Sequence, residues 1–225
     1  MKYTYYGHSS FMVEIDGVRI VFDPYISPNE LAKAVDVNSI KCDYVMLSHG
    51  HFDHVADAEL ITRNNDATII SNFEIATYFG GKKLKYHPMN VGGQWDFGKF
   101  KVKLVNAVHS SVLPDGTYGG ASVGFVVSGE GKSFYYSGDT ALHLDMQLIG
   151  TYQKLERALL CVGDNFTMGI EDALIAAEFV KCNNITAMHI DTFPYIRIDH
   201  IRSVEKFAKA GMTLTLPEIG KTYDM

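Results

Sequence analysis

The sequence predicts an α/β fold in which sheet forms the middle layers and helices cover the outside. Three observations support this. The first half of the 225-residue chain alternates apolar and polar residues as strands do. The second half interleaves strand-like and helix-like segments, and four strand-like runs lead directly to a histidine or an aspartate. Because a chain of this length can bury one large core, a single domain spanning residues 1–225 is expected.

The strands are predicted from period-two alternation. The strongest local signal is a hairpin, in which residues 11–15 and 18–22 are joined by the two-residue turn Asp16-Gly17. A second hairpin turn is expected at residues 128–131, where the sequence is SGEG. Further strands are expected at residues 2–6, 44–47, 68–70, 100–108, 122–127, 134–136, 158–162 and 185–188.

Helices are predicted where apolar residues recur with helical spacing. The segments that show this spacing are residues 57–63, 74–79, 142–155, 172–181 and 201–210. They fall between the predicted strands, mostly in the second half. This order fits helices that pack on the outside of a sheet.

Composition excludes several classes of function. The chain has 20 Lys+Arg against 26 Asp+Glu and no basic block, so nucleic acid is not expected as a partner. No apolar run reaches membrane-spanning length and no apolar leader begins the chain, which predicts a cytoplasmic protein without membrane contact. The three cysteines, at positions 42, 161 and 182, are widely spaced and are expected to be buried reduced thiols.

The densest group of chemically active side chains lies at residues 49–54, HGHFDH, directly after the strand-like residues 44–47. Imidazole and carboxylate are ligands of borderline metal ions. In a turn kept compact by a glycine, His49 and His51 can hold one metal, and Asp53 and His54 can face a second. The plain alternative is a solvated loop in which Asp53 caps a helix that begins near Val55.

Three further strand-like runs end before His109, Asp139 and His189. Active sites of α/β proteins gather at the carboxyl ends of strands, so these side chains are expected to meet the 49–54 cluster. A carboxylate such as Asp139 suits a bridge between two metals about 3.5–4 Å apart, with His109 and His189 completing the two shells. Taken singly, each histidine could be a core residue, and Asp139 could be a turn residue.

The predicted cofactors are two divalent metal ions. The donors are nitrogen and oxygen without thiolate, so the set does not single out one metal. Zinc is the first expectation, and manganese or iron is compatible with the same donors.

These motifs resemble a known family. The pattern His49-x-His51-x-Asp53-His54, followed by His109, Asp139 in SGDT and His189, looks like the full metal-binding set of the metallo-β-lactamase superfamily. The segments GHSSF at 7–11, FDP at 22–24 and NFTMG at 165–169 resemble its compact bacterial metal-dependent hydrolases related to ascorbate-6-phosphate lactonase. The resemblance covers nearly the whole chain. It implies a four-layer αβ/βα sandwich and a metal-dependent hydrolase.

Differences from other branches of the superfamily narrow the expectation. Flavin-partnered diiron oxygen reductases typically carry an acidic residue where this chain has His51. RNA-processing members carry an inserted domain, for which 225 residues leave little room. Antibiotic-cleaving members are normally exported. A small-molecule hydrolase is therefore expected, with a homo-oligomer as an open alternative to a monomer.

The resemblance also implies a mechanism. A water bridging the two metals would lose a proton near neutral pH, and the hydroxide would attack a carbonyl or phosphoryl group of a small ester-like substrate, such as a lactone or phosphodiester. Asp53 is expected to exchange protons with the nucleophile and the leaving group. His8 is a candidate for stabilising negative charge or positioning substrate, with a structural cap as the alternative. Asp23 is expected to orient a ligand histidine.

Two rival functions belong to other classes. One is a metal-dependent binding or sensing protein without turnover, and the other is a mononuclear iron metalloenzyme. The candidate aromatic residues for lining the site are Phe52, Tyr118, Phe193 and Tyr195.

Overall fold

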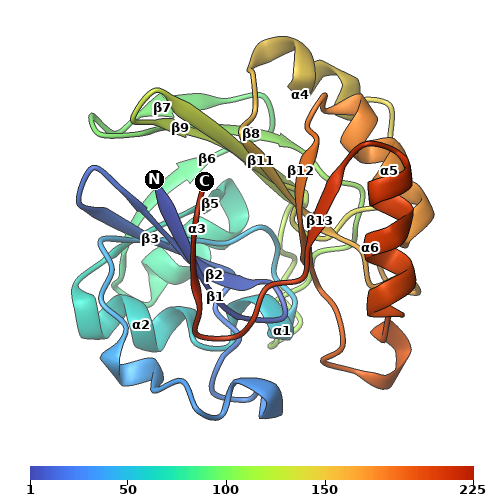
Figure 1. The fold of residues 1–225 in the computed structure, drawn as a ribbon. Helices are drawn as coiled ribbons and strands as arrows, with labels where there is room; N and C mark the ends of the chain where they lie inside the picture. The colour runs from blue at the N-terminus through green and yellow to red at the C-terminus, as the bar shows by residue number, and fades with distance from the viewer.

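Two seven-stranded sheets face each other in the computed structural model, which describes residues 1–225. Helices cover the outer face of each sheet, so the layers follow the order helix, sheet, sheet, helix (Figure 1). This is the four-layer αβ/βα sandwich that the sequence predicts. The two chain ends lie side by side, where the Met225 N–H donates to the Met1 carbonyl.

The first sheet has the strand order β14-β1-β2-β3-β4-β5-β6. Its N-terminal part is antiparallel, whereas β3, β4, β5 and β6 run parallel. The strands are β1 (Lys2–Gly7), β2 (Ser10–Ile15), β3 (Val18–Phe22), β4 (Tyr44–Met46), β5 (Thr68–Asn72), β6 (Lys85–Met89) and β14 (Thr222–Asp224).

The second sheet has the order β13-β12-β11-β10-β9-β8-β7. Because β9 is antiparallel to both β8 and β10, strand β8 runs in the same direction as β10, β11, β12 and β13. The strands are β7 (Gln94–Asp96), β8 (Lys101–Asn106), β9 (Val123–Gly129), β10 (Lys132–Tyr136), β11 (Arg157–Cys161), β12 (Asn184–Met188) and β13 (Thr213–Thr215).

The helices divide between the two outer faces. Those packed on the first sheet are α2 (Ala58–Asn65) and α3 (Phe73–Gly81), preceded by the short α1 (Phe52–Val55). Those on the second sheet are α4 (Met146–Tyr152), α5 (Ile170–Phe179) and α6 (His200–Lys209). Short 3-10 turns occupy Glu30–Ala32, Val37–Ser39 and Pro194–Ile196. None of these helices combines the length and the apolar character needed to cross a membrane.

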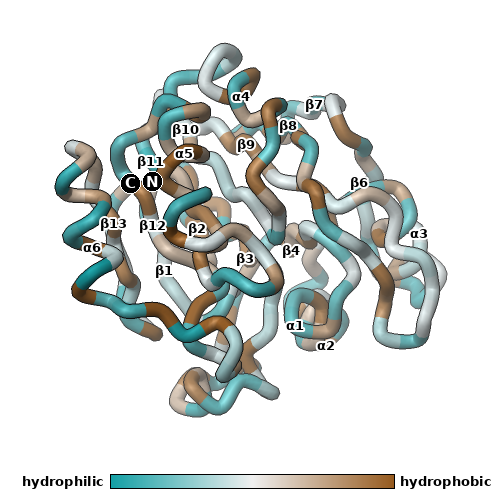
Figure 2. The backbone as a smooth tube through the Cα atoms, turned by 90° about the vertical axis from the view of Figure 1, so that its right-hand side faces the viewer, coloured by the Kyte–Doolittle hydropathy of each residue, from teal (hydrophilic) through white to brown (hydrophobic).

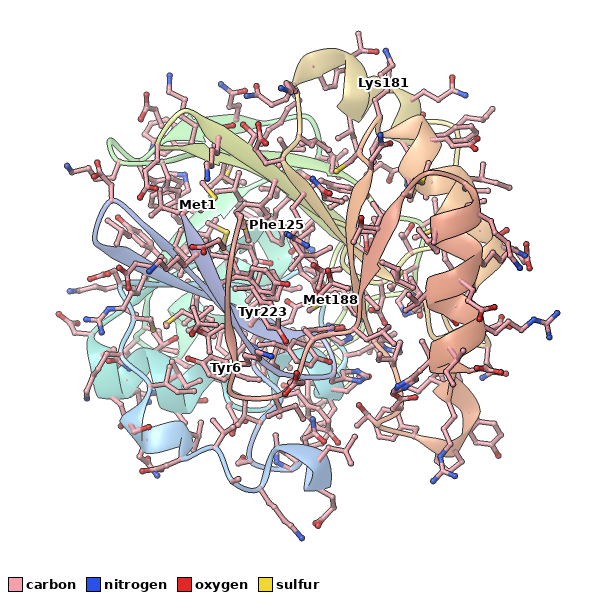
Figure 3. All side chains as sticks on the ribbon, in the orientation of Figure 1. Met1, Tyr6, Phe125, Lys181, Met188 and Tyr223 are labelled. Carbon is pink, nitrogen blue, oxygen red and sulfur yellow. The ribbon has the colours of Figure 1, made fainter.

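The central core lies between the two sheets and is rich in aromatic side chains. The Phe11 and Phe22 rings stack with centroids 4.5 Å apart, and Tyr136 packs edge-on against both. Figure 2 shows that the inner strands carry the hydrophobic stretches, while many peripheral turns are hydrophilic. Figure 3 places the labelled Phe125 and Met188 in this interior, and both are fully buried.

The predicted hairpin is confirmed. Strands β2 and β3 pair from Ile15 with Val18 to Phe11 with Phe22, so Asp16 and Gly17 form a two-residue turn. Both turn residues have positive φ, 53° and 82°, as the mirror-image turns of tight hairpins require. The turn at residues 128–131 likewise joins β9 to β10.

The helix predicted at residues 142–155 is wrong in extent, because only Met146–Tyr152 is helical. The segment before this helix is held next to the site, because the Ala141 N–H donates to the Val108 carbonyl. The helix begins only after that contact. Strand β6 escapes prediction because Pro88 interrupts its pattern. That proline is tolerated because β6 is the edge strand of its sheet.

Candidate metal centre

The predicted site residues come together at one end of the sandwich. Strands β4, β8, β10 and β12 direct their carboxyl ends there, and His49, His109, Asp139 and His189 follow within one to three residues. The His49 side of the site comes from the first sheet and the other three residues from the second. The site therefore lies where the two sheets face each other.

A first group of donors consists of His49, His51 and His109. One ring nitrogen of each lies within 4.8 Å of the others. His49 Nε2 is 3.0 Å from His51 Nδ1, so these rings present different nitrogens to a common point. The fixed turn at Gly50, packed against the backbone of residues 112 and 113, holds the two rings in this arrangement.

A second group consists of Asp53, His54 and His189, with His8 beside them; one donor atom of each lies within 4.8 Å of the others. Asp53 and His54 lie in the single turn of α1, for which His51 is the N-cap. Asp53 is therefore inside the helix and does not cap it. This geometry rules out the plain alternative of a solvated loop with Asp53 as the cap, because His54 is fully buried.

Asp139 lies between the two groups. Its Oδ2 atom is 3.0 Å from His189 Nε2 and 3.3 Å from His54 Nε2 on one side. On the other side, it is 3.7 Å from His109 Nε2 and 4.0 Å from His49 Nε2. The Asp139 carboxylate therefore faces both groups of donors.

Asp23 orients the His54 ring. Its buried carboxylate accepts hydrogen bonds from His54 Nδ1 at 2.8 Å, from the Tyr136 hydroxyl at 2.6 Å and from the Ser48 N–H at 2.7 Å. A bond at Nδ1 leaves Nε2 of His54 free to face Asp139. This agrees with the expectation that Asp23 orients a histidine.

His8 follows β1 and has a left-handed backbone conformation, with φ of 55°. It is buried, and its ring lies between Thr192 Oγ1, 3.0 Å from Nδ1, and Asp53 Oδ2, 3.0 Å from Nε2. Its carbonyl also accepts the His189 N–H at 2.9 Å. His8 therefore touches the site through Asp53 and supports the backbone of His189.

Electrostatics separate the two groups of histidines. Burial lowers the pKa of His51 and His109 and takes that of His49 well below its ordinary value. Burial alone would also lower the pKa of His54 and His189. The carboxylates of Asp139 and Asp53 overcome it, raising the pKa of His54 well above the usual range and that of His189 to about 9.

The two carboxylates respond in the opposite direction. Burial alone would raise the pKa of Asp139 and Asp53, but the surrounding histidines hold both well below the usual value. The site therefore keeps two carboxylates ionised inside the protein, with histidines as their only partners within 4.0 Å.

Two glycines allow this close approach. Gly138 precedes Asp139 with φ of 59°, and a Cβ there would lie 2.8 Å from the Val123 carbonyl oxygen and from Ser48. At Gly163, after β11, a Cβ would lie 2.1 Å from the His189 carbonyl oxygen. Any larger residue at either position would displace a site residue.

The residues fit a metal site. His54 Nε2 and Asp139 Oδ1 are buried and have no hydrogen-bond partner within the protein, although buried polar atoms are normally paired. Five imidazoles and two ionised carboxylates converge here, and two of their buried atoms lack a partner. Imidazoles in the neutral form and ionised carboxylates are the donors that a cation requires.

Some contributors were not predicted from the sequence. Thr192 contacts His8, and the Tyr136 hydroxyl donates to Asp23. Ser48 donates to Asp23 as well, and its Oγ lies 3.0 Å from His49 Nδ1. Only Ser48, directly before the HGHFDH cluster, could have been suspected from its position. Of the candidate aromatic residues, Phe193 lies beside the His8 ring, whereas Tyr118 and Tyr195 are 68% and 72% exposed.

A four-layer αβ/βα sandwich with a His/Asp cluster at the strand ends between its sheets defines the class of metallo-β-lactamase-fold proteins. Comparison with known sequences agrees. A sequence profile described as the β-lactamase superfamily domain matches residues 2–189. The chain belongs to this superfamily, and it is a metal-dependent hydrolase, as its relatives are.

The similarity extends over whole chains. A metal-dependent hydrolase of Flavobacterium johnsoniae is 50% identical over 225 residues, covering 100% of both chains. One of Christiangramia forsetii is 49% identical, again over 100% of both. The solved structure of Igni18, a metallo hydrolase from the archaeon Ignicoccus hospitalis, has a TM-score of 0.91 at 35% identity and covers 100% of this chain and 98% of that one.

Proposed function

We propose that this protein is a binuclear metal-dependent hydrolase that acts on a small ester-like substrate. The observation that carries the proposal is the position of Asp139 Oδ2, within 4.0 Å of histidine nitrogens from both donor groups. A carboxylate between two donor sets suits a bridge between two ions.

In this proposal each group of donors holds one ion. The first ion would be held by His49, His51 and His109, and the second by Asp53, His54 and His189, with Asp139 shared. Two divalent ions, when bound, supply an activated water and a Lewis acid that polarises the substrate oxygen. Imidazole and carboxylate donors suit zinc, and they also allow manganese or iron.

Residues of the chain itself transfer the proton and orient the group that carries it. Asp53 is the most open member of the second group, with 24% of its side chain exposed, so it can reach both a water and a leaving group. Asp53, ionised at rest, would accept the proton released by the attacking water on the oxygen that does not contact the His8 ring, and would pass it to the leaving group. His8, hydrogen-bonded to Thr192 and to Asp53, keeps that carboxylate oriented.

The working unit is proposed to be one domain of residues 1–225, because both halves of the chain supply donors. The three cysteines are free and buried, which supports work in a reducing compartment such as the cytoplasm. A small-molecule substrate is proposed because most of the donors are buried, among them His49, His54, Asp139 and His189.

Metal content tests the binuclear site. Protein purified without a His tag should hold close to two equivalents of metal per chain after replenishment with zinc, manganese or iron. Asp139→Ala should lower this number while the circular dichroism spectrum is retained. One equivalent or none in the wild type would contradict the binuclear site and favour a mononuclear enzyme.

Turnover tests the reaction. The metal-replenished protein should hydrolyse chromogenic carboxylic or phosphodiester substrates, and Asp53→Ala should abolish turnover while the fold is kept. Asp164→Ala, an acidic residue outside the donor groups, serves as the control. Two bound metals without turnover of any of these substrates would favour a binding or sensing protein.

A further inference from the structure

Apolar side chains are exposed on the loops that leave the site. Large hydrophobic residues with 44–73% exposure occur after β4, β8, β10, β11 and β12, the strands whose carboxyl ends lie toward the site. Contiguous exposed apolar surface beside a site marks a place for ligand contact, whereas single exposed apolar residues are ordinary. The exposed residues on these loops are Phe52, Val108, Val112, Tyr118, Leu144, Phe166 and Tyr195.

Aromatic rings form one wall next to the second donor group. The Tyr25 ring packs edge-on against His8 with centroids 5.5 Å apart and against Phe52 with centroids 5.8 Å apart. Phe193 lies 5.4 Å from His8 and 6.3 Å from Tyr25 by the same measure. Of the three, Phe52 is the most open, with 53% exposure, and it directly precedes Asp53.

A hollow on the other face of α1 shares Phe52 with this wall. Its volume is about 340 Å³, within the usual range for small-molecule sites. Phe52, Val55 and Ala56 line it from the helix, because residues three and four apart share a helix face. Asp53 and His54 belong to the donor groups on the site side. Phe52 therefore contacts the aromatic wall and also lines the hollow, whose remaining apolar residues are Phe79, Leu113 and Pro114.

The charged side chains near the aromatic wall and the hollow do not favour binding of an anionic part of a substrate. The only basic side chains within 4.0 Å of the Asp23, Asp53 and Asp139 carboxylates are histidines, so no lysine or arginine pairs with them. The cation at the hollow, Lys82, is already paired with Glu59 at 3.0 Å. A phosphorylated arm would find no unpaired cationic side chain along this path.

We propose that the aromatic wall of Tyr25, Phe52 and Phe193, together with the hollow beyond Phe52, is an apolar subsite. It receives the uncharged hydrocarbon or aryl arm of an ester whose carbonyl lies at the His/Asp cluster. This rests on the hydrolase function proposed above and names its substrate class. Phe52 is the residue that determines selectivity for the arm.

The test combines binding and turnover. Unbranched carboxylates from acetate to octanoate, which stand for the acid product, are titrated into the metal-replenished protein by calorimetry. Affinity should rise roughly fourfold for each methylene that enters the subsite, from about 0.8 kcal/mol per buried methylene. With p-nitrophenyl esters of the same acids, kcat/KM should rise in parallel, and bis(p-nitrophenyl) phosphate should be a poorer substrate.

Two variants locate the effect. Phe52→Ala should flatten the dependence on chain length in both binding and turnover, and Phe52→Leu should retain most of it. Trp95→Ala is the matched control, because Trp95 is 54% exposed but lies on β7 at the edge of the second sheet. It should behave as the wild type.

The two possible failures are distinguishable. Carboxylate affinity that does not depend on chain length, or that depends on it equally in Phe52→Ala, would overturn the apolar subsite even if esters are hydrolysed. Chain-length-dependent binding without hydrolysis of any ester would support the subsite and overturn the proposed hydrolysis of esters.

Discussion

The Asp23 carboxylate accepts a hydrogen bond from His54 Nδ1 at 2.8 Å, and this contact fixes which nitrogen of His54 faces the site. Both residues are fully buried, one after β3 and the other in α1. The opposite nitrogen, Nε2, is left 3.3 Å from Asp139 Oδ2. A residue outside the proposed donor groups thus sets the orientation of one proposed ligand.

Asp23→Asn should therefore weaken metal binding. An amide cannot accept all of the donors that now converge on the carboxylate, so His54 would lose its fixed orientation; losses of about 10- to 100-fold in affinity are typical for such partners. Competition with a chromogenic chelator measures the change. Asp57→Asn is the control, because buried Asp57 accepts the backbone N–H groups of Ile26 and Ser27 away from the donor groups. It should lower stability and leave metal affinity unchanged.

His8→Phe should lower kcat by roughly 10- to 100-fold with little change in KM, because Asp53 would lose its hydrogen bond while the ring volume is kept. Thr192→Val, which removes only the contact to the far nitrogen of His8, should have a smaller effect. Metal content decides the role of His8. If His8→Phe loses an equivalent of metal, His8 is itself a ligand and the positioning role is wrong.

Gly163→Ala should destabilise the fold by about 1–3 kcal/mol, because the added Cβ would lie 2.1 Å from the His189 carbonyl oxygen and both backbones would have to shift. The same shift should weaken metal binding through His189. Urea unfolding and chelator competition measure the two effects. Gly81→Ala is the control, since a Cβ added there, at the end of α3, would meet no atom within 4 Å. An unchanged midpoint for Gly163→Ala would contradict this account.

The metal-free protein should lose stability as pH rises from neutral. The pKa of His189 is raised from 6.5 to about 9, chiefly by Asp139 against the effect of burial, so the folded state holds this proton more tightly than the unfolded state. The contribution, roughly 3 kcal/mol at most, is complete below about pH 6.5 and is lost as pH rises through about 9. Thermal unfolding of metal-stripped protein across this window should show the fall. In Asp139→Asn the fall should be much smaller, and an equal fall in both proteins would refute the assignment.

The sequence by itself determined the features that depend on neighbouring residues. Asp16 and Gly17 predict the first hairpin because Asp-Gly tolerates the positive φ values of a tight two-residue turn, which both residues adopt. The HGHFDH cluster places four donors within six residues, so its chemistry is visible before any fold is known. The family resemblance then predicted the four-layer sandwich, which the structure confirms.

Only the tertiary structure decided the contacts between residues far apart in the chain. Asp139 Oδ2 lies between two donor groups, and the Asp23 carboxylate accepts from both His54 and Tyr136. Both arrangements exist because the two sheets face each other. The same packing allows Pro88 in an edge strand and limits α4 to Met146–Tyr152. Turn geometry and side-chain spacing are set locally, whereas hydrogen bonds across more than 100 residues, such as that from Tyr136 to Asp23, depend on how the sheets pack.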